Sequence, residues 1–518
     1  MDVEAGSEVG IKAGEPTVRT LLERRAAESP DAVYLIAPET GRQLSFSGLA
    51  QAAATVDALL QAHGVATGER VALMLPNGLQ AVSLFVGVMA AGRVVTPLSL
   101  LAQPAQLAWV IEHSGCRLIF AGSEQAAAAQ AALALSGSAA ELVVVDPDSE
   151  VAPPGAAADA PRQPSAAPAA GDDALLMYTS GTTGRPKGVV LTHANVCAGA
   201  RFVSEAHALG ASDRVLAVLP LYHINAQIVT VLATLEHGGS LLMPRRFSAS
   251  AFWSLAADYR CTWLNVVPTM IAYLLDGTEP RASGLDLTRL RFCRSASAPL
   301  SPEHHRAFEA RFGIGIIETM GLTETAAPVF SNPLAPARRK IGSPGQAFGN
   351  EARVVDPASG EVLPDGAAGE IQIRGANVMR GYFRAPEETA RAISSDGWLR
   401  TGDLGYRDGD GFYFITGRLK ELIIKGGENI APREIDEALL KHPAVLEAAA
   451  FGVADAAYGQ EIEAGVVLKP GLASDEAELR AFCQRELGRF KTPRAIRILS
   501  ELPKGPSGKV QRLRLQED

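Results

Sequence analysis

The stretch YTSGTTGRPKGVVLTH at residues 178–193 gathers glycines, hydroxyl groups and two basic residues in one short run. Glycines let the backbone turn sharply and bring its N–H groups close to an anion, while hydroxyl groups and cations add donors and charge. The residues expected to surround a phosphate are Thr179, Ser180, Gly181, Thr182, Thr183, Gly184 and Lys187. Apolar runs at 174–177 and 189–191 predict buried strands that hold this loop at the edge of a sheet.

The loop differs from the GxxxxGK[ST] phosphate loop, because Lys187 is followed by Gly188 and the glycine spacing is different. The alternative is an ordinary surface loop of small polar residues. No Asp or Glu occurs between Ala174 and Ser204, so no carboxylate nearby in the sequence would repel a polyphosphate. The density of donors and the expected sheet edge therefore favour phosphate binding.

Length and composition indicate a packed protein of several domains. The 518 residues suggest roughly three or four domain-sized parts, and 47% hydrophobic with 20% charged residues excludes a disordered chain. A net charge of −9 argues against nucleic-acid binding, which needs a basic face. The five cysteines form no CxxC pair, so we expect reduced core residues, with neither disulfides nor a metal site.

The terminal and apolar segments predict a cytoplasmic protein without membrane insertion. Residues 1–16 are polar and acidic, unlike a signal peptide. The most apolar long stretch, residues 81–91, is too short to span a bilayer.

Strand-like and helix-like patterns alternate along the chain, which predicts a mostly parallel sheet covered by helices, an α/β fold. The expected helices are residues 17–29, 47–64, 77–91 and 227–236. The expected strands are residues 32–36, 70–74, 94–97, 142–145, 215–219, 241–243, 263–267 and 290–293. Residues 151–171 are rich in Ala and Pro and indicate an exposed connector, whereas 345–375 indicate hairpins and a small β unit.

Three further positions have side chains suited to chemistry. Glu324 in GLTET could hold Mg²⁺ near a polyphosphate, although a Glu in this context is also a common helix cap. Asp403 in TGD could accept hydrogen bonds from two sugar hydroxyls, or form a plain Asx turn. His223 ends PLYH after an expected strand, where ligand contacts gather, but a single His is usually structural.

Six stretches in order resemble the adenylate-forming superfamily, which includes acyl-CoA synthetases, peptide-synthetase adenylation domains and firefly-type luciferases. They are YTSGTTGRPKGV, PLYH, GLTET, TGD, GRLKELIIKGGENI and PKGPSGK, and the resemblance runs from about Thr17 onward. It implies a large N-terminal domain, residues 1–418, of helix-covered sheets plus a small β unit. It also implies a small, mobile α+β C-terminal domain, residues 419–518, hinged near Lys420.

The resemblance implies an enzyme that joins an acid to ATP, releases pyrophosphate and passes the acyl group from AMP to the thiol of coenzyme A. The phosphate loop would hold the β- and γ-phosphates, Glu324 would hold Mg²⁺, and Thr323 would lie beside the α-phosphate. Asp403 would bind the ribose and Arg418 would lie near the nucleotide. The segments implied to line the adenine and the acid contain Ser297, Ala298, Pro299, Glu318, Thr319, Met320 and Gly321.

The resemblance also implies two poses of the C-terminal domain. In the first, Lys509 would bridge the attacking carboxylate and the α-phosphate. Rotation about Lys420 would then withdraw Lys509 and bring Lys425, Gly426, Gly427 and Glu428 to a pantetheine tunnel. His223 would stand near the acyl carbonyl and the mouth of this tunnel.

Two departures from the family pattern affect the pocket. Met320 replaces the usual aromatic residue before GLTE, which puts ring stacking on the adenine or the acyl group in doubt there. The run Ser295–Ala298 replaces a more glycine-rich turn and narrows the expected pocket.

The acid substrate is less clearly marked. No Asp follows PLYH, which argues against an amino acid, and RSASAPL (294–300), ETAAPVFSNP (324–333) and PRRFSASAFW (244–253) resemble the oxalate–CoA and carnitine–CoA ligase branch. A second anionic group could meet Asn225, Gln227, Arg245 or Arg294, unless Arg245, Arg246 and Arg294 are solvated surface residues. We expect a dicarboxylate or sulfonated acid. The alternatives are a medium-chain or aryl acid and transfer to a carrier-protein thiol, with a monomer or homodimer in each case.

Overall fold

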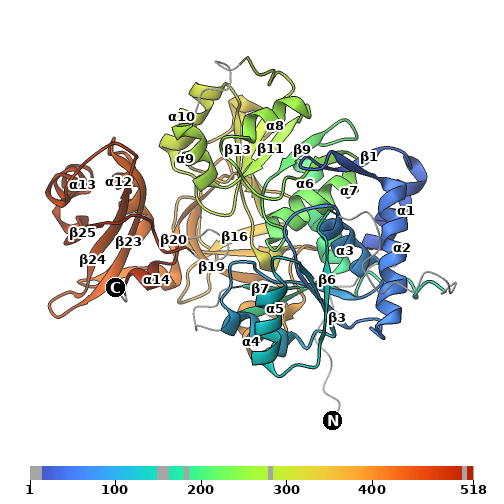
Figure 1. Ribbon diagram of the computed structural model, residues 1–518. Helices are drawn as coiled ribbons and strands as arrows, with labels where there is room; N and C mark the ends of the chain where they lie inside the picture. Colours follow the sequence, from blue (N-terminus) through green and yellow to red (C-terminus); the bar gives the residue numbers. More distant parts are fainter. Residues whose placement is uncertain (1–14, 149–162, 180–185, 278–283, 505–509, 517–518) are drawn as a thin grey trace, which may run out of the picture.

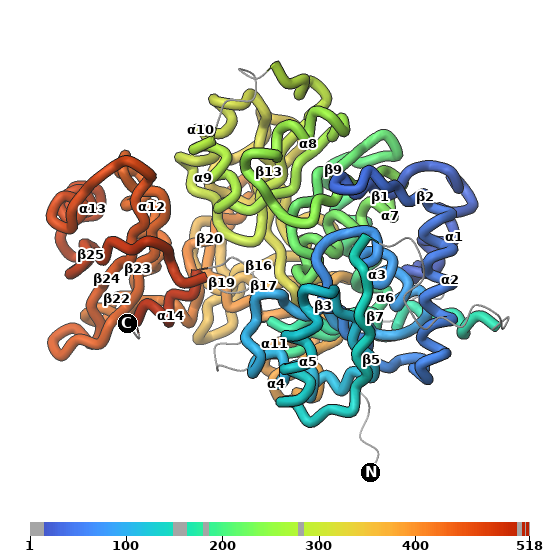
Figure 2. Tube along the Cα trace, viewed as in Figure 1, coloured from blue at the N-terminus to red at the C-terminus, as the bar shows by residue number. Residues whose placement is uncertain are grey.

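The computed structural model describes residues 15–148, 163–179, 186–277, 284–504 and 510–516 (Figure 1). Two large, mostly parallel sheets form the N-terminal part, and both are covered by helices. A four-stranded sheet follows them, and the C-terminal part forms a sheet of its own to one side (Figure 2). The expected α/β class is confirmed.

The seven-stranded sheet contains the strands on both sides of the glycine-rich loop. In spatial order it consists of β18 (Gly381–Tyr382), β8 (Lys187–Thr192), β7 (Asp173–Thr179), β4 (Val94–Pro97), β3 (Arg70–Met74), β5 (Leu118–Gly122) and β6 (Glu141–Val145). The pairs from β7 to β6 are parallel, whereas β8 runs antiparallel to both β7 and β18. The loop thus joins two neighbouring strands near one edge, as the sequence predicts.

The nine-stranded sheet holds the segments expected to line the adenine and the acid. Its order is β15 (Gln346–Ala347), β14 (Phe330–Ser331), β13 (Ile316–Met320), β12 (Phe292–Ser295), β11 (Trp263–Val266), β9 (Arg214–Ala217), β10 (Ser240–Leu242), β1 (Val33–Ala37) and β2 (Arg42–Ser45). The strands from β13 to β1 pair in parallel. The polar turns after β12 and β13 therefore emerge at the same edge of the sheet.

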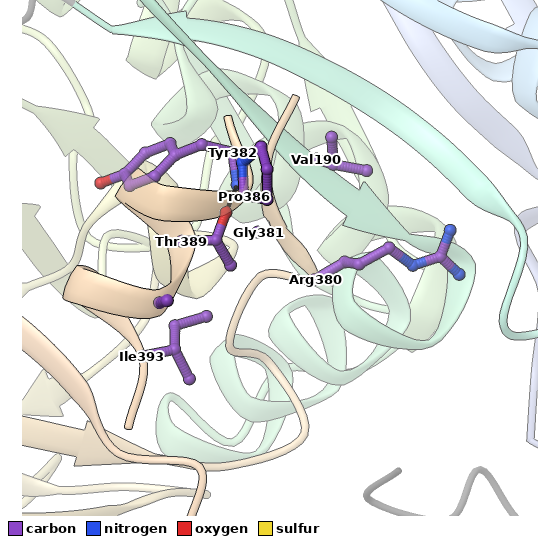
Figure 3. A pocket seen from close by; sticks show the side chains of 8 residues that line it. Val190, Arg380, Gly381, Tyr382, Pro386, Thr389 and Ile393 are labelled. Atoms are coloured by element: carbon purple, nitrogen blue, oxygen red, sulfur yellow. Dashed lines mark hydrogen bonds between the residues drawn. The ribbon is translucent and has the colours of Figure 1, made fainter. Parts of the chain in front are cut away.

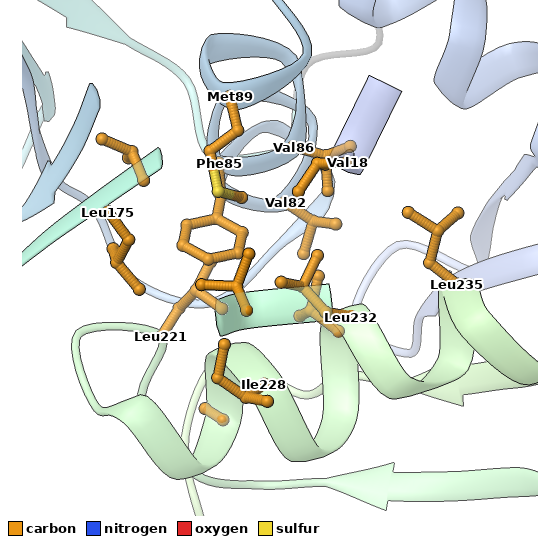
Figure 4. Packing of buried hydrophobic residues seen from close by; sticks show 14 of the residues in the cluster. Val18, Val82, Phe85, Val86, Met89, Leu175, Leu221, Ile228, Leu232 and Leu235 are labelled. Atoms are coloured by element: carbon orange, nitrogen blue, oxygen red, sulfur yellow. The ribbon is translucent and has the colours of Figure 1, made fainter. Parts of the chain in front are cut away.

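The main core lies between these two sheets and is built on helices of both (Figure 4). These helices are α1 (Val18–Glu28), α2 (Phe46–Ala62), α3 (Leu79–Ala90), α6 (His193–Ala206), the π-helix η1 (Asn225–Leu232) and α7 (Ala233–His237). Every residue of α3 is buried, as expected for a helix that is apolar on all sides. Its Phe85 packs with Ile228 and Leu232 of η1 in this core, which fixes the PLYH segment just before η1.

Further helices cover the outer faces of the sheets. The nine-stranded sheet packs against α8 (Phe252–Asp258), α9 (Pro268–Asp276) and α10 (Pro302–Phe312), and the seven-stranded sheet against α4 (Pro104–Ser114) and α5 (Ala126–Ser136). None of the helices in the described ranges is long and apolar enough to cross a membrane. All five cysteines are buried, as expected for core residues.

The four-stranded sheet is the expected small β unit. It consists of β16 (Glu351–Val355), β17 (Gly369–Arg374), β19 (Leu399–Arg407) and β20 (Tyr413–Arg418), all antiparallel. Short elements around it are η3 (Thr323–Thr325), η4 (Pro336–Arg338) and α11 (Pro386–Ala392).

The C-terminal part follows a 3₁₀ turn, η5 (Leu419–Glu421). Its sheet contains β21 (Ile423–Lys425), β22 (Glu428–Ile430), β23 (Val445–Asp455), β24 (Gly459–Leu468) and β25 (Ala495–Ile498), with α12 (Pro432–Leu440), α13 (Glu476–Lys491) and α14 (Arg512–Leu515). This sheet shares a core with α12 and α13. The predicted boundary at residue 418 thus falls between β20 and η5, and the rotation remains a prediction.

Candidate active site

Lys187 and Glu324 both contact Tyr382. Lys187 begins β8 at the end of the glycine-rich loop, and its Nζ lies 5.1 Å from the centre of the Tyr382 ring. The Tyr382 hydroxyl donates a hydrogen bond to Oε1 of Glu324 at 3.1 Å. Tyr382 is held there because β18 pairs with β8, opposite Val189. The structure thus brings the cation of the phosphate loop and the expected magnesium carboxylate to one place.

The charges in this cluster influence each other. Burial raises the pKa of Tyr382, and the negative charge of Glu324 raises it further, so its hydroxyl stays protonated and can donate. Lys187 also pairs with Glu388 of α11, and this hydrogen bond lowers the pKa of Glu388. An arriving polyphosphate would compete with Glu388 for the ammonium group of Lys187.

Tight backbone geometry surrounds Glu324. A Cβ atom at Gly321 would lie 1.3 Å from the carbonyl oxygen of Ala327, so only glycine fits there. Ala326 and Ala327 have φ values of 44° and 80°, a region that L-residues with a Cβ rarely adopt. Strained residues of this kind cluster at functional sites. Thr323 lies beside Glu324 in the η3 turn, half-buried.

Asp403 and Arg418, both expected near a nucleotide, form an ion pair on two neighbouring strands. They face each other in the register of β19 and β20, and Nε of Arg418 donates to Oδ1 of Asp403 at 2.7 Å. The Asp403 side chain is 5% exposed and that of Arg418 46%. The charge of Asp403 raises the pKa of Arg418, and Glu324 contributes to the same shift. The pair therefore lies within electrostatic reach of the Lys187 and Glu324 cluster.

The turns after β12 and β13 bring together the segments expected to line the adenine and the acid. Ser297 has a φ of 74° and accepts a hydrogen bond from Nδ2 of Asn225 at 3.0 Å. Glu318 is 3% exposed; its Oε1 accepts from the backbone N–H of Leu300 at 3.2 Å, and burial raises its pKa. The hydroxyl of Thr319 donates to the Ser295 carbonyl at 3.4 Å. Of the four remaining positions, Ala298, Met320 and Gly321 are half-buried and Pro299 is exposed.

The arginines named as candidates differ sharply in burial. Arg245 and Arg246 are exposed, and Arg245 pairs with Asp148. Arg294 is 2% exposed, so the alternative of a solvated surface residue is wrong for it. Gln227 is fully buried, and its Nε2 donates to the Leu221 carbonyl at 2.7 Å, bracing the PLYH segment.

His223 lies half-buried immediately before η1. The centres of its ring and the Tyr222 ring are 4.4 Å apart in an edge-on contact. The sequence predicted an ordinary helix at residues 227–236, but residues 225–232 form a π-helix. π-Helical turns are rare and are frequently found at functional sites.

Lys425 contacts residues of β24 and α13 in the C-terminal part. Its Nζ pairs with Glu461 at 2.5 Å and donates to the Phe490 carbonyl at 2.8 Å. Gly426 and Gly427 form the turn between β21 and β22, and Glu428 pairs with Lys425 across it. These contacts all lie on the C-terminal side of η5, apart from the cluster of Lys187, Glu324 and Tyr382.

Lys509 and the loop residues Ser180, Gly181, Thr182, Thr183 and Gly184 lie outside the described residues. The chain on both sides of Lys509 is anchored. Lys504 pairs with Glu447 at 2.6 Å, and Arg512 pairs with Asp436 and lies 3.4 Å from Glu421 of η5. Thr179, which opens the loop, is half-buried at the end of β7.

Sequence reasoning missed Tyr382, Glu388 and Asn265. They lie far along the chain from the motifs they contact, and nothing in their local sequence signals the contact.

A cavity of about 450 Å³ lies beside Tyr382 (Figure 3). It is lined by Val190, Arg380, Gly381, Tyr382, Pro386, Thr389, Ala390 and Ile393. In Figure 3 the Tyr382 hydroxyl extends away from Arg380, so this cavity borders the cluster from outside.

Known proteins resemble this chain over nearly its whole length. Residues 22–383 match the family model described as AMP-binding enzyme, and residues 434–509 match the AMP-binding enzyme C-terminal domain. A sulfoacetate–CoA ligase from Cupriavidus necator is 56% identical over 499 residues, covering 96% of this chain and 97% of its own. An oxalate–CoA ligase from Arabidopsis thaliana is 36% identical over 471 residues, covering 88% and 89%.

A solved structure has the same fold over nearly the whole length. ATP-bound MatB from Rhodopseudomonas palustris superposes with a TM-score of 0.88 at 31% identity, covering 97% of this chain and 99% of its own. The match of both family models, the full-length relatives and the shared fold lead to one conclusion: the chain belongs to the AMP-binding enzyme family.

Proposed function

We propose that this protein is an ATP-dependent, AMP-forming acid–CoA ligase that acts on a short polar acid, such as a dicarboxylate or a sulfonated acid. The observation that carries the proposal is the contact of Lys187 and Glu324 with the same tyrosine, beside the glycine-rich loop. A cation and a carboxylate placed together at such a loop suit a polyphosphate and its metal ion. The relatives named sulfoacetate–CoA and oxalate–CoA ligase support an acid with two acidic groups.

In the first step, a carboxylate oxygen of the acid attacks the α-phosphorus of ATP. The bond from this phosphorus to the bridging oxygen breaks, and pyrophosphate leaves with the electron pair. The barrier arises from crowded negative charge and from positioning. Lys187 and the loop from Thr179 to Gly184 would hold the outer phosphates, Asp403 would accept from the ribose hydroxyls, and Lys509 would bridge acid and phosphate.

Glu324 suits a magnesium ion. Mg²⁺ is commonly held by one or two carboxylates together with substrate phosphates, and when bound it supplies positive charge against the phosphate oxygens. The Tyr382 hydroxyl orients Glu324 through Oε1, and the strained turn at Ala326 and Ala327 limits its movement. Thr323 would approach the α-phosphate from the same turn.

In the second step, the CoA thiol releases its proton to water and its sulfur forms a bond to the acyl carbon. The carbon–oxygen bond to AMP breaks, and AMP leaves. The domain at residues 419–518 would rotate near Lys420 and bring Lys425, Gly426, Gly427 and Glu428 to the tunnel, with His223 near the carbonyl. All the residues of the proposed reaction lie on one chain, so the enzyme would work as a monomer or as a homodimer. Its use of ATP and CoA suits the cytoplasm.

Two measurements test this proposal. Pyrophosphate release is followed with ATP, Mg²⁺ and a panel containing sulfoacetate, oxalate, malonate, hexanoate and benzoate. CoA is then added and the thioester is identified by mass spectrometry. We expect release with a short acid bearing two acidic groups, and a CoA thioester. Release with hexanoate or benzoate alone would favour the medium-chain or aryl alternative, and acyl-AMP without thioester would favour a carrier thiol as acceptor.

A further inference from the structure

A buried arginine without a counter-charge lies near the end of β12. Arg294 is 2% exposed, and burial lowers the pKa of its guanidinium to about 9, so it remains charged at pH 7. Its hydrogen bonds go to two neutral amide oxygens, and among the described residues no carboxylate pairs with it. Burying a charge without a partner is costly, and proteins rarely do so without a reason.

Two asparagines hold this guanidinium in one orientation. Nη1 of Arg294 donates to Oδ1 of Asn225 at 3.1 Å and to Oδ1 of Asn265 at 3.0 Å. Asn265 is its register partner on β11, and Nδ2 of Asn265 donates to Oδ1 of Asn225 at 3.1 Å. Nε of Arg294 has no acceptor within the described part of the chain. The amide oxygens thus orient the cation without neutralising it, and donors remain available.

The same asparagine connects Arg294 to both segments of the proposed acid pocket. Asn225 is the first residue of η1, two positions after His223. Its Nδ2 donates to Ser297, whose left-handed backbone forms the turn after β12. Through Asn225, Arg294 is therefore linked to the two segments that carry His223 and Ser297.

The free space beside Arg294 is small. A cavity with about 10 Å³ of room, enough for about one water, is lined by Arg294, Phe202, His207, Thr319, Phe330, Phe348 and neighbouring residues. Burial lowers the pKa of His207 to about 3, so His207 is neutral at pH 7. Arg294 is then the charged side chain among the lining residues. This space admits no aryl ring or long chain, and a carboxylate or sulfonate would reach the free donors of Arg294 only with a shift of the lining side chains.

We propose that Arg294, oriented by Asn225 and Asn265, binds the second anionic group of the acid substrate and so selects short acids with two negative charges. The inference rests on the proposed function and assigns its substrate selectivity to one residue. A planar guanidinium donates two parallel hydrogen bonds to a carboxylate or a sulfonate, which the exposed and already paired Arg245 is not placed to do.

The test compares Arg294→Gln with wild type on sulfoacetate and on propionate, which lacks the second anion. Losing one partner of a buried charge pair predicts a fall in kcat/KM for sulfoacetate of roughly 30- to several thousand-fold. Turnover of propionate should change little. Arg245→Gln is the matched control and should leave both acids unchanged, because Arg245 is exposed and paired with Asp148.

A second variant tests the charge without removing the arginine. Asn265→Asp places a carboxylate against Nη1 of Arg294 and neutralises it in place, but it also removes the hydrogen bond from Nδ2 of Asn265 to Asn225, so the melting temperature is measured alongside. We expect the same selective loss of sulfoacetate. An equal loss of both acids in both variants, or an unchanged ratio, would overturn the inference and leave Arg294 with a packing role.

Binding of sulfoacetate, measured by calorimetry in the presence of a nonhydrolysable ATP analogue, separates this inference from the proposed function. If wild type binds sulfoacetate but releases no pyrophosphate with any acid, the proposed function fails. If Arg294→Gln then fails to bind sulfoacetate, the result still supports Arg294 as the residue that binds the second anionic group. If Arg294→Gln binds sulfoacetate as tightly as wild type does, the inference is overturned.

Discussion

Replacing Asp403 by asparagine is expected to weaken ATP binding roughly 30- to 150-fold. The change keeps the shape of the side chain but removes its charge. Asp403 is 5% exposed and already accepts from Arg418 at 2.7 Å, and this contact holds the carboxylate that we propose as the acceptor for the ribose. Two hydroxyl donors would lose about 1 to 1.5 kcal/mol each when a charged acceptor becomes neutral, about 2 to 3 kcal/mol in total.

The assay is the ATP dependence of pyrophosphate exchange, supported by direct calorimetric binding of ATP. Asp365→Asn is the matched control, because Asp365 pairs with Arg407 of the same strand β19 at 2.6 Å but is 41% exposed. It should leave ATP binding unchanged, since exposed ion pairs contribute little. If Asp403→Asn melts like wild type and binds ATP equally well, the assignment of Asp403 to the ribose is wrong.

Three further outcomes are expected. Tyr382→Phe removes the hydrogen bond to Glu324 and should lower kcat about three- to tenfold. Pyrophosphate exchange should also need a higher Mg²⁺ concentration. An unchanged Mg²⁺ titration would contradict the role of Glu324. Asp213→Asn should lower the free energy of unfolding by about 2 kcal/mol at pH 7, because desolvation of Asp213 is outweighed by hydrogen bonds from Arg291 and others that lower its pKa. That stability is present above the unfolded pKa of 3.8 and is lost as the pH falls through the folded pKa of Asp213. The urea midpoints of wild type and variant should therefore converge in acid. A difference between the two midpoints that stays constant with pH would refute this reasoning. Lys509→Ala should abolish acyl-AMP formation but retain thioester formation from supplied acyl-AMP; equal loss of both would argue against two poses.

Local pattern was enough to place most elements. The strands at 70–74 and 94–97 were predicted with the bounds that β3 and β4 have, and the first helices end within about two residues of α1 and α2. The strand predicted at 290–293 lies instead at Phe292–Ser295. Its last two residues, Arg294 and Ser295, are polar yet buried, so an apolar run could not indicate them.

The helix after PLYH shows another limit of sequence reasoning. Apolar spacing predicted an α-helix at residues 227–236, whereas residues 225–232 are π-helical and residues 233–237 follow as α7. The spacing of apolar side chains indicates which face of a helix is apolar. It does not indicate whether each backbone N–H bonds to the carbonyl four residues before it, as in an α-helix, or five, as in a π-helix. The wider helix begins at Asn225, next to the proposed acid pocket.

The sequence by itself determined the α/β class, the family and the order of the motifs, because glycine spacing, hydrophobic alternation and motif order are properties of neighbouring residues. Tertiary structure alone decided that Tyr382 joins Lys187 to Glu324, and that Arg294 is buried beside Asn225 and Asn265. Glu388 reaches Lys187 across 201 residues, and Asn225 reaches Arg294 across 69. Strand pairing and packing between residues so far apart in the chain determine which charged side chains contact each other and which are buried away from water.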